Sequence, residues 1–202
     1  VPTPLRYAGK SLLSVQHLHP GNFALVMASG IISIGMGLLG NRVLADILFL
    51  FAVCAWMVLL ALSLLRLLRF AARLRDELLN PRMVFSYFTL VAATNIVGLL
   101  LLDRGYSVSA IACWAIAFGA WCSLLYLAFS VLTFLSHEHN VNIVHGGWLI
   151  TIVGTQSLVL LGSRIAPLLG QYAGYMMVEV HMLWGLGLIF YGIFVTLFCY
   201  RI

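Results

Sequence analysis

The stretch MVFSYFTLVAATNIVGLLLLDRG, residues 83–105, contains the pattern that decides the fold: a long uncharged run that ends at Asp103, Arg104 and Gly105. A bilayer core is about 30 Å thick, and an α-helix rising about 1.5 Å per residue crosses it in roughly 20 apolar residues. Similar runs lie on both sides, and we expect membrane spans at about residues 21–40, 44–68, 83–102, 108–135, 147–166 and 172–199. The sequence therefore predicts an all-α integral membrane protein, with six transmembrane helices in a domain over residues 21–202.

Short and long breaks alternate between these spans. The short breaks are Asn41-Arg42, Asp103-Arg104-Gly105 and the segment 164–170 with Pro167, whereas the long polar ones are residues 66–82 and 136–147. A short break with turn-forming residues joins antiparallel neighbours. The six helices are therefore expected to form three hairpins.

The three expected hairpins begin alike. Phe23, Phe85 and Trp148 each follow a few turn-forming or polar residues, and they are 62 and 63 residues apart. A unit of two helices returns the chain to the side of the membrane where it started. Such repeats are therefore parallel and related by an axis along the membrane normal.

The composition excludes several other classes of protein. Of the 202 residues, 63% are hydrophobic and 8% are charged, whereas soluble domains have about 25% charged residues. These values exclude a water-soluble single core, a disordered chain and a nucleic-acid-binding domain. The four cysteines lie inside apolar runs without a CxxC pair, so we interpret them as packing residues.

The positions of the eleven basic residues predict the orientation of the chain. Arg42, Arg104 and Arg164 lie in or beside the short breaks. The other eight, which lie on the opposite side, are Arg6, Lys10, Arg66, Arg69, Arg73, Arg75, Arg82 and Arg201. Cytoplasmic segments of membrane proteins are rich in basic residues, so residues 1–20, both long loops and the C-terminal end are expected to be cytoplasmic, in a plasma (inner) membrane. The net charge of +5 is thus a topology signal and poor evidence of an anionic ligand.

Polar and small residues are concentrated in the odd-numbered helices. The third span contains Asn95 and Gly98, and the fifth contains Thr151 and Thr155, whereas the second is almost purely Leu, Val, Phe and Ala. Uncompensated polar groups are costly against lipid, so odd-numbered helices are expected to be inner and even-numbered helices outer. The small residues fit close helix packing as well as they fit the lining of a pore.

Three stretches at the beginnings of the odd-numbered helices are distinctive as a set. They are HPGNFALVMASGIISIGMG (residues 19–37), NPRMVFSYFTLVAATNIVG (residues 80–98) and GGWLITIVGTQSLVLLG (residues 146–162). In this order and spacing, from about residue 17 to the end, the sequence resembles the tellurite-resistance/dicarboxylate transporter family, which includes the plant slow-type anion channels.

The resemblance implies a fold of ten helices in five hairpins, in which odd-numbered helices line a central pore and subunits form trimers. Members of the family move anions, among them dicarboxylates, sulfite, chloride and nitrate, as channels or as carriers. We therefore expect membrane transport of small anions, with lipid and further copies of the chain as partners, and no nucleic acid. A non-conducting membrane scaffold or a subunit of a larger complex is the alternative.

The number of repeats departs from this family pattern. Five repeats of this length would need roughly 300 residues, and the sequence contains three repeats. We favour the interpretation that these residues are part of a longer protein; the alternative is a pore that closes by another route. The family's gating phenylalanine lies on the ninth helix, so no residue of this sequence takes that role.

Helical stripes extended from the matched aromatic residues give the expected pore-lining residues. They are Phe23, Met27, Gly30, Ile34, Gly37, Phe88, Val91, Asn95, Gly98, Trp148, Thr151, Thr155 and Leu158. These apolar groups and weak donors carry no fixed charge, which suits weak binding of anions at several sites.

Ionisable residues outside this set give further candidate sites. Glu179 and His181 lie inside the sixth span, where ionisable residues are functional candidates; they are about 200° apart on a helix, and Glu179 is the candidate proton-coupling residue. The cluster of His137, Glu138, His139 and His145 lacks the spacing of a tetrahedral site, so no metal or cofactor is expected. No catalytic motif is recognisable, so an enzyme is not expected. Asp46 is interpreted as a helix-dipole partner, and Asp76-Glu77 as a solvated ion-pair patch.

Overall fold

The computed structural model describes residues 18–81, 83–135 and 146–201. The long helices are α2 (Ala24–Leu38), α3 (Arg42–Arg69), α5 (Phe88–Leu102), α6 (Ser107–Ser130), α7 (Ile150–Ile165) and α8 (Ala173–Arg201), and α4 (Ala71–Leu78) is short. Shorter helical turns are η1 (Pro20–Phe23), η2 (Val84–Tyr87), η3 (Val131–Leu135), η5 (Gly146–Leu149) and η6 (Ala166–Tyr172). The described residues contain no strand, and the prediction of an all-α membrane fold is confirmed.

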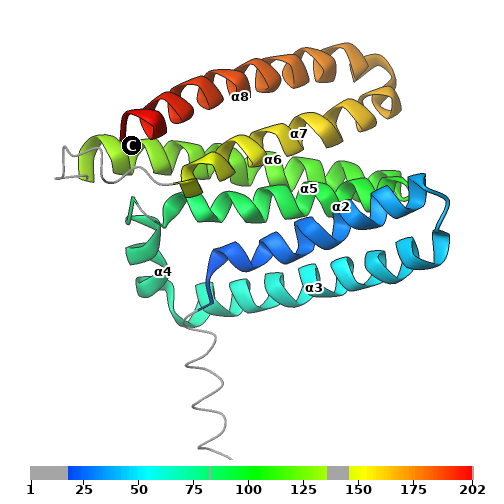
Figure 1. The fold of residues 1–202 in the computed structure, drawn as a ribbon, viewed down its shortest axis with the longest axis horizontal. Coiled ribbons are helices and arrows are strands. Elements are labelled where there is room, and N and C mark those ends of the chain that lie inside the picture. The colour runs from blue at the N-terminus through cyan, green and yellow to red at the C-terminus, as the bar shows by residue number, and fades with distance from the viewer. Residues whose placement is uncertain (1–17, 82, 136–145, 202) are drawn as a thin grey trace, which may run out of the picture.

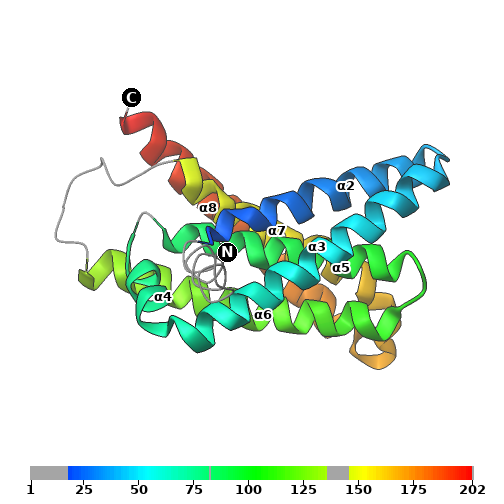
Figure 2. The same cartoon turned by 90° about the horizontal axis from the view of Figure 1, so that it is seen from below.

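Three antiparallel hairpins, α2–α3, α5–α6 and α7–α8, form the molecule (Figure 1). Their turns lie together at one end, which we call the turn end, and α4 lies at the opposite end, which we call the α4 end (Figures 1 and 2). Each hairpin begins and ends at the α4 end, so the three hairpins repeat in parallel.

A glycine in the left-handed backbone region forms part of each hairpin turn. Gly40, Gly105 and Gly170 have φ angles of 82°, 86° and 55°, and they are 65 residues apart. A Cβ is strained in this conformation, so glycine is favoured there. The third turn divides the apolar run Gly146–Tyr200, which is 55 residues long, into α7 and α8.

The odd-numbered spans α5 and α7 are inner, and the even-numbered spans α3, α6 and α8 are outer. α5 lies in the centre and packs against α2, α3, α6 and α7. The buried share of its apolar span is 78%, compared with 6% for the α3 span and 22% for the α6 span. The α2 span lies at the edge of the arrangement and is 28% buried. A polar site that is shielded from lipid is therefore expected beside α5.

An aromatic cluster closes the core at the α4 end. It consists of Phe85, Phe88, Trp148, Phe190 and Phe194. The ring centroids of Phe85 and Trp148 are 4.7 Å apart, and those of Trp148 and Phe194 are 5.8 Å apart. Because these residues come from η2, α5, η5 and α8, the cluster fixes the second hairpin against the third.

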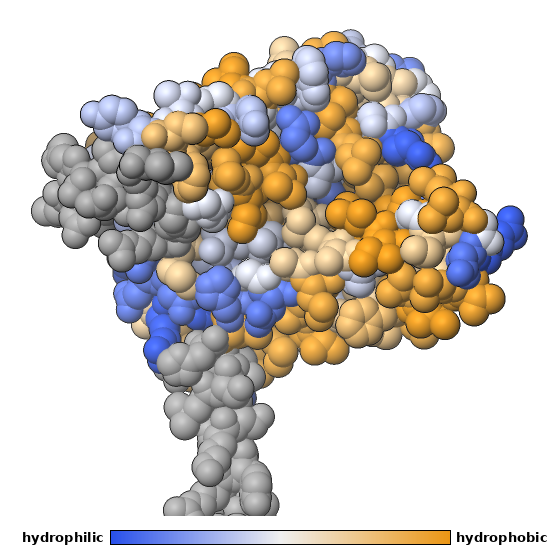
Figure 3. Space-filling view, in the orientation of Figure 1, coloured by the Kyte–Doolittle hydropathy of each residue, from blue (hydrophilic) through white to orange (hydrophobic). Residues whose placement is uncertain are grey.

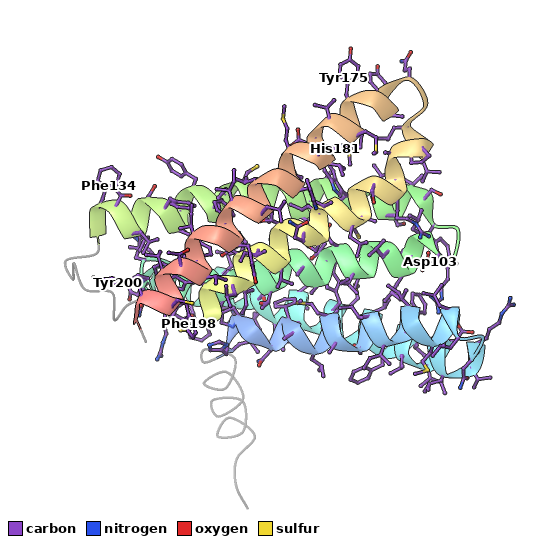
Figure 4. The ribbon with its side chains drawn as sticks, turned by 45° about the horizontal axis from the view of Figure 1, so that its top comes forward. Asp103, Phe134, Tyr175, His181, Phe198 and Tyr200 are labelled. Atoms are coloured by element: carbon purple, nitrogen blue, oxygen red, sulfur yellow. The ribbon has the colours of Figure 1, made fainter. Side chains whose placement is uncertain are left out.

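The outside of the bundle carries many large apolar side chains (Figure 3). An apolar surface of this extent is rare on a soluble monomer but suits contact with lipid tails. Exposed aromatic residues mark both ends: Tyr175 lies near the turn end, and Phe134 and Tyr200 lie near the α4 end (Figure 4). Aromatic side chains of this kind are enriched at membrane–water interfaces.

Candidate functional site

Polar side chains of α5 and α7 meet in the interior of the bundle. Asn95, which is fully buried, donates from Nδ2 to Ser157 Oγ at 2.9 Å, and Ser157 donates to the Gly154 carbonyl at 2.7 Å. Asn95 Oδ1 has no hydrogen-bond partner among the described residues. A buried acceptor is costly to leave unpaired. The contact between α5 and α7 therefore leaves Asn95 Oδ1 free to accept a hydrogen bond from a ligand or water.

Two donors at the beginning of the third hairpin are also buried without a partner. They are Trp148 Nε1 and Thr151 Oγ, and within the described part of the chain neither forms a hydrogen bond. Residues three apart share a face of a helix. Buried polar groups are almost always hydrogen-bonded, and an exception calls for an explanation such as a bound ion. These two donors are therefore the best ligand-binding candidates in the described interior.

The side of α7 that faces α6 is used for packing instead. Trp121 Nε1 donates to Thr155 Oγ at 2.9 Å, and Thr155 Oγ donates to the Thr151 carbonyl at 2.8 Å. Trp114 Nε1, also on α6, donates to the Leu158 carbonyl at 3.0 Å. The two tryptophans thus position α7 without using Thr151 Oγ.

A pocket of about 580 Å³ lies at the turn end, where the three hairpins meet. Its lining includes Ser33, Ile34 and Gly37 of α2 and the charged residues Arg42, Asp46, Asp103, Arg104 and Arg164. Figure 4 shows Asp103 at this end of the molecule. The pocket therefore combines part of an inner helix with all three arginines that the sequence analysis assigned to this side.

Two ion pairs beside the pocket connect consecutive hairpins. Arg104 Nη2 lies 2.6 Å from Asp46 Oδ1, and Arg164 Nη2 lies 3.0 Å from Asp103 Oδ1. In each pair the carboxylate belongs to the earlier hairpin and the arginine to the later one. Arg42 occupies the corresponding place in the first hairpin and forms no ion pair with any described residue. The pocket therefore has one positive charge in excess.

A comparison with protein-family models matches residues 17–202 to a family described as voltage-dependent anion channel. The chain belongs to the voltage-dependent anion channel family. This match confirms the family resemblance, and its members are channels and transporters that move anions across membranes. No characterised protein and no solved structure matches the chain.

Most of the predicted pore-lining residues are buried between helices. The buried ones are Phe23, Gly30, Phe88, Val91, Asn95, Gly98, Trp148, Thr151, Thr155 and Leu158. Met27 and Ile34 are half-buried, and Gly37 is exposed. Ile34 and Gly37 line the pocket at the turn end. Asn95 and Thr151 thus both lie in the interior of the bundle, and Ile34 and Gly37, near the end of α2, lie at the pocket.

Helix packing accounts for two of the predicted glycines. Gly30 is approached by Ile96 and Leu100 of α5. A Cβ at Gly98 would lie 3.1 Å from the Cβ of Cys113 and closer still to Leu161. Trp148 and Thr151 differ from these glycines because packing does not satisfy their donors. A pore-lining role for the set stays a prediction.

Sequence reasoning missed a buried charge network at the α4 end of the molecule. Arg66 is 3% exposed; it donates from Nη1 to the Leu18 carbonyl at 2.8 Å and from Nη2 to Glu77. Tyr87 Oη donates to Glu77 at 3.0 Å. The interpretation of Glu77 as part of a solvated patch was therefore wrong. The available signal was the position of Arg66 inside the last turns of an apolar span.

The main contact of Asp46 also differs from the helix-dipole role that the sequence predicted. It forms an ion pair with Arg104 of the next hairpin, so a local helix-dipole role does not describe its main contact. The partner is 58 residues away, which is why local sequence reasoning could not identify it.

The remaining candidates lie apart from the interior donors. Glu179 is half-buried on α8 and has no ion pair within the described ranges, so proton coupling stays a prediction. His181 is exposed on α8, with Nδ1 2.6 Å from the Met177 carbonyl (Figure 4). No group of three His, Cys, Asp or Glu that could hold a metal occurs among the described residues. Residues outside the described ranges include Arg6, Lys10, Arg82, His137, Glu138, His139 and His145.

Proposed function

We propose that α2, α5 and α7 line a pathway along which small anions cross the membrane. The observation that carries this proposal is the pair of buried, unpartnered donors on an inner helix, Trp148 Nε1–H and Thr151 Oγ–H. Anions accept hydrogen bonds from donors of this kind, and an indole N–H can only donate. Neither donor carries a fixed charge, so an anion is held weakly enough to leave again.

The proposed substrates are small anions of the dicarboxylate, sulfite, chloride or nitrate class, moved in a channel-like or carrier mode. Arg42, which has no ion pair with a described residue, adds a positive charge to the pocket at the turn end. Positive charge at the mouth of a pathway raises the local concentration of anions.

The orientation and the assembly belong to the same proposal. Basic residues cluster at the α4 end, which supports a cytoplasmic location for that end in a plasma (inner) membrane. Lipid and further copies of the chain, as in a trimer, are the proposed neighbours of the exposed outer helices. Cross-linking of the complete protein in its membrane tests the copy number.

Anion flux into liposomes that contain the complete protein tests the pathway. Thr151→Val removes the donor and retains the shape of the side chain. We expect flux to fall about tenfold, because a hydrogen bond to a charged group contributes about 1.5–3 kcal/mol. Thr196→Val is the matched control, since Thr196 is exposed on α8 and donates to the Gly192 carbonyl of its own helix at 2.7 Å; its flux should equal that of the unmodified protein.

Two outcomes would contradict the proposal in different ways. Equal flux through the Thr151→Val and Thr196→Val proteins would remove Thr151 from the pathway. An absence of chloride, nitrate, sulfite and malate flux through the complete protein under any gradient would favour a non-conducting membrane scaffold.

A further inference from the structure

A second cavity, separate from the interior donors, lies at the α4 end. This groove has a volume of about 390 Å³, which is within the range of roughly 300–1,000 Å³ found for small-molecule sites. Its walls include Leu60 and Leu64 of α3 and Leu124 of α6, and Leu90 of α5 lies between these walls. We call it the α3–α6 groove.

The groove exists because two outer helices pack on the same inner helix. α3 and α6 both pack against α5 and make no extensive contact with each other in the described part of the chain. The side chains of Ser63 on α3 and Ser123 on α6 are small and line the space between them. The walls of the groove are thus apolar and continue the lipid-facing surface of the outer helices.

The short helix α4 covers one end of the groove. Leu74 and Leu78, which are one turn apart, line the groove from α4. Arg75 is exposed on the same helix, and Arg69 is exposed at the end of α3. Leu74 and Leu78 thus share one face of a short helix, and Arg75 and Arg69 are exposed beside that face; short helices with an apolar face and basic flanks are typical of a membrane interface. Basic side chains there attract anionic lipid headgroups.

A buried hydrogen-bond donor in the groove favours a ligand that has acceptor atoms. Arg66 also lines the groove, and its Nε has no hydrogen-bond partner among the described residues. The groove therefore offers apolar walls, a buried guanidinium N–H and two exposed arginines near one end. A zwitterionic lipid matches the walls equally well but matches the arginines less well.

We propose that the α3–α6 groove binds one acyl chain of an anionic phospholipid, taken from the leaflet at the α4 end, with the headgroup held by Arg69 and Arg75. The groove shares only Phe23 with the residues predicted to line the anion pathway, and it does not include Trp148 or Thr151, which carry that proposal. The lipid fills the space that α3 and α6 leave beside α5, and it links α4 to the bilayer surface.

Native mass spectrometry of the complete protein, after incubation with phosphatidylglycerol or phosphatidylcholine, tests this proposal. We expect the protein to retain at least fivefold more phosphatidylglycerol than phosphatidylcholine. Ser123→Trp fills the groove and should lower the retained phosphatidylglycerol at least fivefold. Ser109→Trp, on the exposed surface of the same helix near the turn end, should retain as much as the unmodified protein.

A second variant keeps the test decisive if Ser123→Trp does not fold. The double substitution Arg69→Gln and Arg75→Gln leaves the walls intact and should abolish the preference for phosphatidylglycerol while phosphatidylcholine retention stays unchanged. Equal retention of the two lipids by the unmodified protein would overturn the proposal. Full phosphatidylglycerol retention by a folded Ser123→Trp protein would overturn it as well.

Discussion

Arg66 is a charged residue that the fold buries, and its partners come from three separate parts of the chain. The Leu18 carbonyl, Glu77 of α4 and, through Glu77, Tyr87 of η2 form one network around it. Removing one partner of a buried ion pair leaves an uncompensated charge, which costs about 3–5 kcal/mol. The position of α4 is therefore coupled to the stability of the first two hairpins.

At this scale we expect Glu77→Ala to lower the free energy of unfolding by about 3 kcal/mol. Asp76→Ala is the matched control: Asp76 is exposed on the same helix, and surface substitutions usually change stability by less than about 0.5 kcal/mol. Denaturant titration of both variants in the same detergent measures the difference. Equal midpoints for the two variants would show that Glu77 does not stabilise the buried guanidinium.

The interior polar residues illustrate what could be predicted at the residue scale. Asn95, Thr151 and Thr155 were expected on inner helices because polar groups avoid lipid, and all three are buried. Their partners could not be predicted, because Ser157 is 62 residues from Asn95 and Trp121 is 34 residues from Thr155. Such pairs depend on the rotation of each helix, which an almost uniformly apolar sequence does not determine.

At the scale of elements, the position of α5 depends on its tight packing against α6 and α7 as well as on its polar contacts. Its Gly98 faces Cys113 and Ala110 of α6 and Leu161 of α7, with little space for a further atom. The apolar length of α5 predicted a membrane span. Its central position could not be predicted. The spans α2, α5 and α7 have similar sequences, and packing between the hairpins decides which of them lies in the middle.

We expect Gly98→Ala to destabilise the protein by about 1–2 kcal/mol, because overpacking of a tight contact outweighs the gain in helix propensity. Gly119→Ala on α6 is the control, since a Cβ there meets no atom within 4 Å. It should stabilise the protein by about 0.5–1 kcal/mol. Thermal unfolding of the two variants measures both effects; a stabilised Gly98→Ala protein would contradict the close approach.

At the scale of the whole molecule, the repeat was predicted from aromatic spacing and is clearest in the three turn glycines. The ion pairs that join the hairpins were not predicted, since each links residues about one repeat apart. Asp46 and Arg104 have side-chain exposures of 71% and 24%, so their pair is largely solvated. Exposed ion pairs contribute about 0.2–1 kcal/mol.

A double-mutant cycle of Asp46→Asn and Arg104→Gln should therefore give a coupling free energy below about 1 kcal/mol. The cycle is measured by denaturant titration of the single and double variants. A coupling above about 2 kcal/mol would mean that this pair is a principal source of stability between the hairpins, which its exposure argues against.

The direction of the two ion pairs has a consequence for biogenesis. A chain that enters the membrane hairpin by hairpin places Asp46 before Arg104 emerges, and Asp103 before Arg164 emerges. Each arriving arginine then meets a carboxylate that is already in position, whereas Asp46 and Asp103 have no counter-ion until the next hairpin arrives.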